Sequence, residues 1–131
     1  MREIILKDVL FIYPLLANCV SEQHQQNLIY EDSQYVEVLD VGCGNSALLE
    51  QMYDRDRFKK LMGIDFCKVV IEQMTERNAK VRPELKFREM DCLRLDFAER
   101  SFDLVIDKAT LDTLLCGENP YLTVARYLKE V

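Results

Sequence analysis

From Val36 onward, one pattern of apolar and polar positions recurs along the chain. A short apolar run ends in an aspartate, a turn follows, and a stretch with helical spacing leads to the next run. Apolar runs of this length, bounded by turn residues, are typical of buried strands. We therefore predict four strands, over residues 36–41 (VEVLDV), 60–65 (KLMGID), 85–91 (LKFREMD) and 102–107 (FDLVID).

The stretches between the first three runs have the spacing of amphipathic helices. In residues 46–58 the apolar positions form one helical stripe, made of Leu48, Leu49, Met52 and Tyr53. Residues 67–80 repeat this spacing, and Pro83 prevents the helix from continuing. Because these connections are too long for hairpins, they predict parallel strands joined by right-handed crossovers. The fold class is therefore α/β, with helices on both faces of the sheet.

Two more helices are predicted outside this region. Residues 8–20 form the longest apolar stretch, which we interpret as a helix packed on the core and interrupted at Pro14. This stretch is too short to span a bilayer, which takes about 18 or more apolar residues. Residues 121–131, after the fourth strand, predict the other helix.

Composition limits the kinds of protein and partner that fit this chain. The chain has 131 residues, which fits a single domain over residues 1–131. Its 17 basic and 23 acidic residues give a net charge of −6, which argues against a nucleic-acid partner. Five cysteines without a CxxC pair, beside one histidine, argue against a metal site. With no apparent signal peptide or membrane span, the thiols favour the cytoplasm.

The end of the first predicted strand carries the candidate ligand site. Residues 38–46 read VLDVGCGNS, with Gly42 and Gly44 on either side of Cys43. Glycines at this point allow a tight turn, so that a ligand can approach main-chain N–H groups. Extended to Ala47, the loop also fits a dinucleotide fingerprint, with Asp65 as the expected ribose ligand. The loop alone therefore leaves both a nicotinamide dinucleotide and S-adenosylmethionine possible.

Two carboxylates favour the second ligand. Asp40 lies two residues before the first glycine, where it would repel the pyrophosphate of a dinucleotide. S-adenosylmethionine has no phosphate and carries a sulfonium and an ammonium group. Asp91, at the end of the third predicted strand, is placed to accept a hydrogen bond from an adenine amino group. Acids at successive strand ends therefore suit a cationic nucleoside.

The succession of motifs resembles a known family. VLDVGCGNS, GIDFCKVVIEQM, MDCLRLDF and SFDLVIDKATLD are similar to the motifs of class I S-adenosylmethionine-dependent methyltransferases. More narrowly, they resemble the methyltransferase-like lysine methyltransferases of translation elongation factor 1 alpha. The narrower likeness depends on Asn45 and Ser46 and on residues 107–112 (DKATLD), and the likeness covers residues 36 to about 120. It implies a Rossmann-like, doubly wound, mostly parallel sheet with strand order 3-2-1-4.

The resemblance also implies roles for individual residues. The expected cofactor-binding residues are Asp40, Gly42, Cys43, Gly44, Asn45, Ser46, Asp65, Phe66, Asp91 and Cys92. Among them, Asp65 would hold the ribose hydroxyls, Phe66 would stack near the adenine, and Asp91 with Cys92 would reach its edge. Asp107, at the end of the fourth strand, is the expected catalytic residue, facing the transferable methyl group and the incoming nucleophile.

The sequence departs from its relatives in two respects. Ala109 stands where the relatives usually have glycine, which would strain the turn if its φ is positive. The chain also stops where relatives continue into a fifth strand and an antiparallel pair, so the last three strands are expected to be missing. We then expect the strand over residues 102–107 to be an exposed edge that invites homo-oligomerisation.

Three functions follow from these observations. The first is an S-adenosylmethionine-dependent methyltransferase, with a protein lysine, possibly in elongation factor 1 alpha, as the acceptor by resemblance. The second is a non-catalytic module that binds the cofactor or a partner, because the predicted cofactor residues are present while the acceptor half is not. The third, a nicotinamide oxidoreductase, is disfavoured by Asp40 and Asp91.

Overall fold

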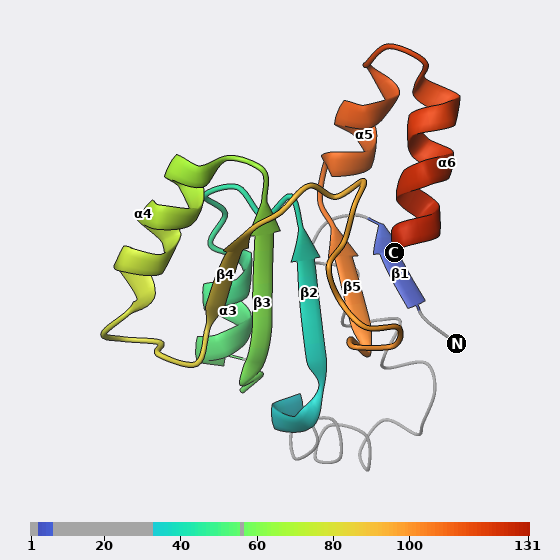
Figure 1. Cartoon of the computed structure of the whole chain (residues 1–131). Coiled ribbons are helices and arrows are strands. Elements are labelled where there is room, and N and C mark those ends of the chain that lie inside the picture. Colours follow the sequence, from blue (N-terminus) through green and yellow to red (C-terminus); the bar gives the residue numbers. More distant parts are fainter. Residues whose placement is uncertain (1–2, 7–32, 56) are drawn as a thin grey trace.

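A parallel sheet forms the centre of the molecule (Figure 1). The computed structural model describes residues 3–6, 33–55 and 57–131. Within them the sheet has five strands in the order β1-β5-β2-β3-β4, and each neighbouring pair is parallel. The strands are β1 (Glu3–Leu6), β2 (Glu37–Val41), β3 (Lys60–Asp65), β4 (Lys86–Glu89) and β5 (Leu104–Asp107).

The four predicted strands are confirmed, and so is their order. Strands β2, β3, β4 and β5 are the first to fourth runs of the sequence pattern, and they lie in the order β4-β3-β2-β5. This is the order 3-2-1-4 of a Rossmann-like sheet. The carboxyl ends of the strands therefore meet along one edge of the sheet.

The prediction of an open edge at the fourth strand is wrong. β1 pairs with β5 in parallel, from Glu3 opposite Leu104 to Leu6 opposite Asp107. The outer edge of β5 is therefore occupied, and homo-oligomerisation through it loses its basis. The pattern did not reveal β1, because this strand is only four residues long and no glycine or turn signal separates it from the apolar stretch that follows. The helix predicted over residues 8–20 lies outside the described residues.

Three of the described helices lie at predicted positions, and two short ones were not predicted. A short 3-10 helix, η2 (Ser33–Tyr35), precedes β2. The three longer helices are α3 (Leu48–Arg55), α4 (Lys68–Asn78) and α6 (Pro120–Glu130), and all were predicted. Helix α5 (Thr110–Leu115) was not predicted, because six residues are too few to show a helical period.

The two faces of the sheet have separate cores. On one face, Val38, Leu61 and Ile106 pack with the buried stripe Leu48, Leu49 and Met52 of α3. On the other face, Leu39, Val41, Ile64 and Val105 pack with Tyr127 of α6 and with side chains from the segment between β4 and β5. Figure 1 shows α3 behind the sheet and this segment crossing in front of it. Burial on both faces explains why the central strands β2 and β5 are mainly apolar and do not alternate.

Within the described ranges, no helix is both long and apolar enough to cross a membrane.

Candidate functional site

A cavity of about 490 Å³ lies at the carboxyl ends of the strands. Its walls come from four segments that follow β2, β3, β4 and β5, which are far apart in the sequence. The described lining residues are Gly42, Asp65, Phe66, Met90, Asp91, Cys92, Leu93, Lys108, Ala109, Thr110, Thr113 and Leu114. Ligands of open α/β sheets bind at this edge, where the order of strands reverses. The structure therefore brings together Gly42, Asp65, Phe66, Asp91 and Cys92, which the sequence placed in a cofactor site.

The glycine turn fits closely against the segment that follows β5. Gly42 has a φ of +68°, which residues with a Cβ rarely adopt. A Cβ at Gly42 would lie 1.9 Å from Thr110 Oγ1. Thr110 Oγ1 in turn donates a hydrogen bond of 2.8 Å to the carbonyl oxygen of Val41. Glycine at position 42 thus allows Thr110 to join the two strand ends that form the cavity.

Asp65 connects the glycine turn with the start of α4. Its Oδ2 accepts a hydrogen bond from the Gly44 N–H at 3.0 Å, and its Oδ1 accepts one from the Cys67 N–H at 2.9 Å. A carboxylate oxygen can accept more than one hydrogen bond, so both oxygens retain capacity for a ligand hydroxyl. Asp65 therefore joins the glycine turn to the start of α4 and also borders the cavity.

Asp40 is a buried carboxyl group with one oxygen that accepts no hydrogen bond from the described residues. Its residue is 2% exposed, and its Oδ1 has no hydrogen-bond partner among the described residues. Burial raises the pKa of Asp40 to about 7, Lys108 opposes this shift, and the negative charges of Asp107 and Asp65 add to it. Burying an unpaired carboxylate is costly, and a cationic group nearby would offset that cost. Asp40 is therefore suited to a positively charged ligand.

The rim of the cavity carries one exposed aromatic ring and one exposed acid. Phe66 is 81% exposed, although it lies directly after β3. Asp91 is exposed as well, and its Oδ1 accepts a hydrogen bond from the Leu93 N–H at 2.9 Å. Cys92 beside it is half-buried, and burial raises the pKa of its thiol. A flat apolar surface and a hydrogen-bond acceptor are thus available to one ligand.

Five predicted cofactor residues do not appear among the described residues that line the cavity: Asp40, and the turn residues Cys43, Gly44, Asn45 and Ser46. Cys43 is buried under the turn, and burial raises the pKa of its thiol to about 12, so it is not a nucleophile. Ser46 Oγ accepts a hydrogen bond from the Leu48 N–H and caps α3. Gly44 donates to Asp65, and Asn45 is exposed. These residues shape the turn, and their contact with a cofactor stays a prediction.

Asp107 lies at the end of β5, as the sequence indicated, but its carboxylate is 3% exposed. Oδ1 accepts a hydrogen bond from the Thr110 N–H at 2.9 Å, and Oδ2 accepts from the Leu111 N–H at 3.1 Å. The Tyr127 hydroxyl also donates to Oδ2. In this structure Asp107 thus holds the start of α5, and its described neighbours Lys108, Ala109 and Thr110 line the cavity instead. Its role toward a nucleophile stays a prediction.

The wall formed by α5 was missed at the sequence level. Thr110, Thr113 and Leu114 face the cavity from this helix. The sequence did contain one signal for this helix. Asp107 ends a strand and lies three residues before Thr110, a spacing that is typical of an aspartate whose side chain caps a helix.

Ala109 adopts the positive φ that its sequence position suggested. Its φ is +75° and its ψ is −1°, in the left-handed region. A side chain in this region costs about 1 kcal/mol relative to glycine. We expect Ala109→Gly to raise the free energy of unfolding by about 1 kcal/mol, measured by urea denaturation. Ala98→Gly, at an exposed alanine with no positive φ, is the matched control, and a gain there of the same size would contradict this explanation.

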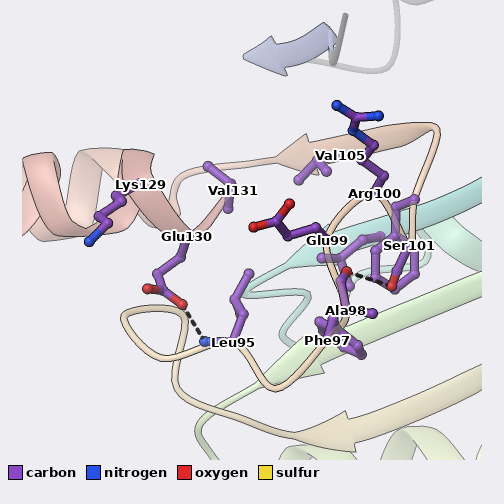
Figure 2. A pocket seen from close by; sticks show the side chains of 12 residues that line it. Leu95, Phe97, Ala98, Glu99, Arg100, Ser101, Val105, Lys129, Glu130 and Val131 are labelled. Carbon is purple, nitrogen blue, oxygen red and sulfur yellow. Dashed lines mark hydrogen bonds between the residues drawn. The ribbon is translucent and has the colours of Figure 1, made fainter.

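A second cavity, of about 420 Å³, lies between the end of α6 and the segment before β5 (Figure 2). Leu39 and Val105 of the sheet contribute to it, and Glu130 Oε2 accepts a hydrogen bond from the Leu95 N–H at 2.8 Å. Figure 2 shows the charged side chains of Glu99, Arg100 and Lys129 around it. None of the predicted cofactor residues is among its described lining residues, whereas five of them line the first cavity.

A sheet of order 3-2-1-4 with an acidic, glycine-lined cavity at its carboxyl edge defines a Rossmann-like nucleoside-binding domain. Residues 32–130 match the family described as "Methyltransferase domain". The chain belongs to this family.

Several curated proteins are similar in sequence to this chain. The "eEF1A lysine and N-terminal methyltransferase" of Bos taurus is 49% identical over 81 residues, which are 62% of this chain and 11% of that protein. The mouse protein of the same name is 45% identical over 96 residues, which are 72% of this chain and 14% of that protein. The "EEF1A lysine methyltransferase 4" of Mus musculus is 42% identical over 81 residues, or 31% of its length. The chain thus spans a small part of each relative.

Solved structures show the same fold. The PH0226 protein from Pyrococcus horikoshii OT3 superposes with a TM-score of 0.60 at 23% identity, over 91% of this chain and 57% of that chain. The plantazolicin methyltransferase BpumL, solved in complex with a triazolic desmethylPZN analog and SAH, gives a TM-score of 0.53 at 20% identity. That match covers 92% of this chain and 47% of BpumL.

Proposed function

We propose that this chain is the cofactor-binding part of an S-adenosylmethionine-dependent methyltransferase that acts on a protein lysine. The observation that carries the proposal is Asp40, whose buried Oδ1 lacks a partner among the described residues. Asp40 is not in the described lining of the cavity, but the charges of Lys108 and Asp65, which are, act on its pKa. Asp65 and Asp91 place two carboxylates in the cavity wall. A ligand that bears an ammonium and a sulfonium group would neutralise this charge, whereas a pyrophosphate would be repelled.

The residues present fit the parts of this cofactor. We propose that Asp40 and the main chain at Gly42 receive its methionine portion, because Gly42 lines the cavity without a side chain and Asp40 Oδ1 lacks a partner among the described residues. Asp65 would accept hydrogen bonds from the ribose hydroxyls with its remaining capacity. The exposed ring of Phe66 would stack on the adenine, and Asp91 would accept from its amino group. The relative BpumL, which shares the fold, was solved with SAH bound.

When bound, the cofactor supplies an electrophilic methyl group on a sulfonium sulfur. The work left to the protein is to bind, to align the acceptor and to exclude water. An acceptor lysine has to be neutral to attack, and after transfer its nitrogen loses a proton to solvent. We propose that Asp107 contributes by holding the segment over residues 108–110 against the cavity, and that it orients the amine if that segment opens to admit the substrate.

The names of the relatives support a proposal for the acceptor, and the free cysteines support one for the compartment. Proteins from cattle and mouse that carry the name eEF1A lysine and N-terminal methyltransferase share 45–49% identity with this chain. We therefore propose eEF1A as the protein partner and the cytoplasm as the compartment. The four described cysteines, Cys43, Cys67, Cys92 and Cys116, are all free, as suits a reducing compartment.

Calorimetric titration tests the cofactor. We expect S-adenosylhomocysteine to bind and NAD to give no heat above dilution. Binding of NAD alone would replace the proposal with an oxidoreductase, and binding of neither ligand would refute the cofactor site.

Transfer of tritiated methyl groups to purified eEF1A tests the reaction. The wild-type chain is compared with Asp107→Asn and with Asp112→Ala, which removes an exposed acid of α5 that does not line the cavity. We expect transfer by the wild type and by Asp112→Ala, and a large loss with Asp107→Asn. A chain that binds S-adenosylhomocysteine but transfers nothing to eEF1A would be a binding module or would use another acceptor.

A further inference from the structure

Tyr127 of α6 makes a buried polar contact that the proposed chemistry does not use. The residue is 0% exposed, and its ring packs in the core formed by Leu39, Val41 and Val105. Its hydroxyl lies in this apolar surrounding and donates a hydrogen bond of 2.5 Å to Asp107 Oδ2. A phenylalanine would fill the same space without needing a hydrogen-bond partner. The hydrogen bond to Asp107 is therefore what the hydroxyl group adds at this position.

Asp107 connects Tyr127 to the start of α5, which forms part of the cavity wall. Its two oxygens accept hydrogen bonds from the N–H groups of Thr110 and Leu111, the first residues of α5. Thr110 also donates through Oγ1 to Val41, directly before the glycine turn. Lys108 and Ala109, between Asp107 and this helix, line the cavity together with Thr110. One continuous chain of hydrogen bonds thus runs from Tyr127 to the glycine turn.

We propose that Tyr127 is a positioning residue of the cofactor site: through Asp107, its hydroxyl holds the segment over residues 108–110 against the glycine turn. This inference rests on the proposed function, since it concerns the same cavity. Tyr127 is not among the described lining residues of the cavity, although it shares a core with Met90 and Leu114, which are. Its hydroxyl group reaches the cavity wall through the hydrogen bond to Asp107.

The protonation of Tyr127 agrees with this role. Burial raises the pKa of the phenol, and the hydrogen bond to Asp107 raises it further. The hydroxyl therefore remains a donor at neutral pH, and the contact does not switch within the physiological range.

The experiment compares Tyr127→Phe with wild type in the full chain, by calorimetric titration with S-adenosylhomocysteine and by hydrogen exchange. Because a buried hydrogen bond to a carboxylate is lost, we expect the affinity to fall by roughly tenfold. We also expect faster exchange at the amides of Thr110 and Leu111. Ile71→Val is the matched control, because it shortens a buried side chain of α4 that lies outside the described lining of the cavity.

The double variant Asp107→Asn with Tyr127→Phe separates positioning from a general loss of stability. If Tyr127 acts through Asp107, the double variant binds about as weakly as Asp107→Asn alone. The inference is overturned if wild type binds and Tyr127→Phe binds equally well, or if Ile71→Val weakens binding as much. If wild type itself does not bind S-adenosylhomocysteine, the proposed function fails first and the inference fails with it.

Discussion

Asp40→Asn is expected to stabilise the empty protein at pH 8 and to weaken the binding of S-adenosylhomocysteine at least tenfold. At this pH the wild-type chain holds a buried carboxylate whose Oδ1 has no partner among the described residues. A neutral amide is less costly to bury, so we expect a gain of about 1–2 kcal/mol in the free energy of unfolding. The same substitution removes the charge proposed to receive the ammonium group of the ligand, and affinity falls for that reason.

The pH profile of stability provides a second measurement of the same carboxyl group. The pKa of Asp40 is 3.8 as its ordinary value and about 7 in the folded chain, because of burial. Between these values the folded state holds a proton that the unfolded state has lost. The contribution of Asp40 to the free energy of unfolding therefore falls as pH rises from about 4 to about 7, by up to about 4 kcal/mol.

Urea denaturation at pH 5 and pH 8 measures this fall. The fall in the free energy of unfolding between pH 5 and pH 8 should be smaller in Asp40→Asn than in wild type. It should be the same as in wild type in Asp91→Asn, where the replaced acid is exposed. If Asp40→Asn binds S-adenosylhomocysteine as tightly as wild type, Asp40 does not contact the ligand. If its stability depends on pH as that of wild type does, the buried acid is not the cause.

Gly42→Ala is expected to destabilise the chain by about 3 kcal/mol and to abolish ligand binding. The new Cβ would lie 1.9 Å from Thr110 Oγ1, and Thr110 cannot turn away without losing its hydrogen bond to Val41. The φ of +68° adds strain of about 1 kcal/mol for a residue with a side chain. The start of α5 would then separate from the glycine turn and open the cavity wall.

Gly44→Ala is the matched control for this substitution. Its φ of +53° is also positive, but a Cβ there would meet no described atom within 4 Å. We expect a loss of only about 1 kcal/mol from backbone strain. Urea denaturation and titration with S-adenosylhomocysteine on both variants check the difference. Equal losses of stability and affinity in the two variants would show that both arise from backbone strain at the glycines. The contact of Gly42 with Thr110 would then have no measurable effect.

The fold between Val36 and Asp107 was predictable because β2, β3 and β5 are mainly apolar runs followed by turns, with helical spacing between successive runs. Besides the short η2, β1 and α5 escaped this reasoning for physical reasons. β1 has four residues, and its pairing with β5 depends on a partner far along the chain. α5 begins where Asp107 accepts hydrogen bonds from the N–H groups of Thr110 and Leu111, a tertiary feature with no periodic signature.

The candidate site was predictable in position more than in detail. Parallel strands bring their carboxyl ends to one edge, and Asp65 and Asp91 therefore line one cavity there. Spacing cannot show where a side chain turns at that edge. Ser46 caps a helix, and the carboxylate of Asp107 turns toward Tyr127 of α6, whose position depends on how that helix packs.

The pairing of β1 with β5 sets an order of assembly during synthesis. β2, β3 and β4 are consecutive neighbours, so this part of the sheet can pair as it leaves the ribosome. β1 emerges first but has to wait for a partner about a hundred residues later, and closing so long a loop is slow. Glu3–Leu6 thus remains without its partner strand until β5 has been made.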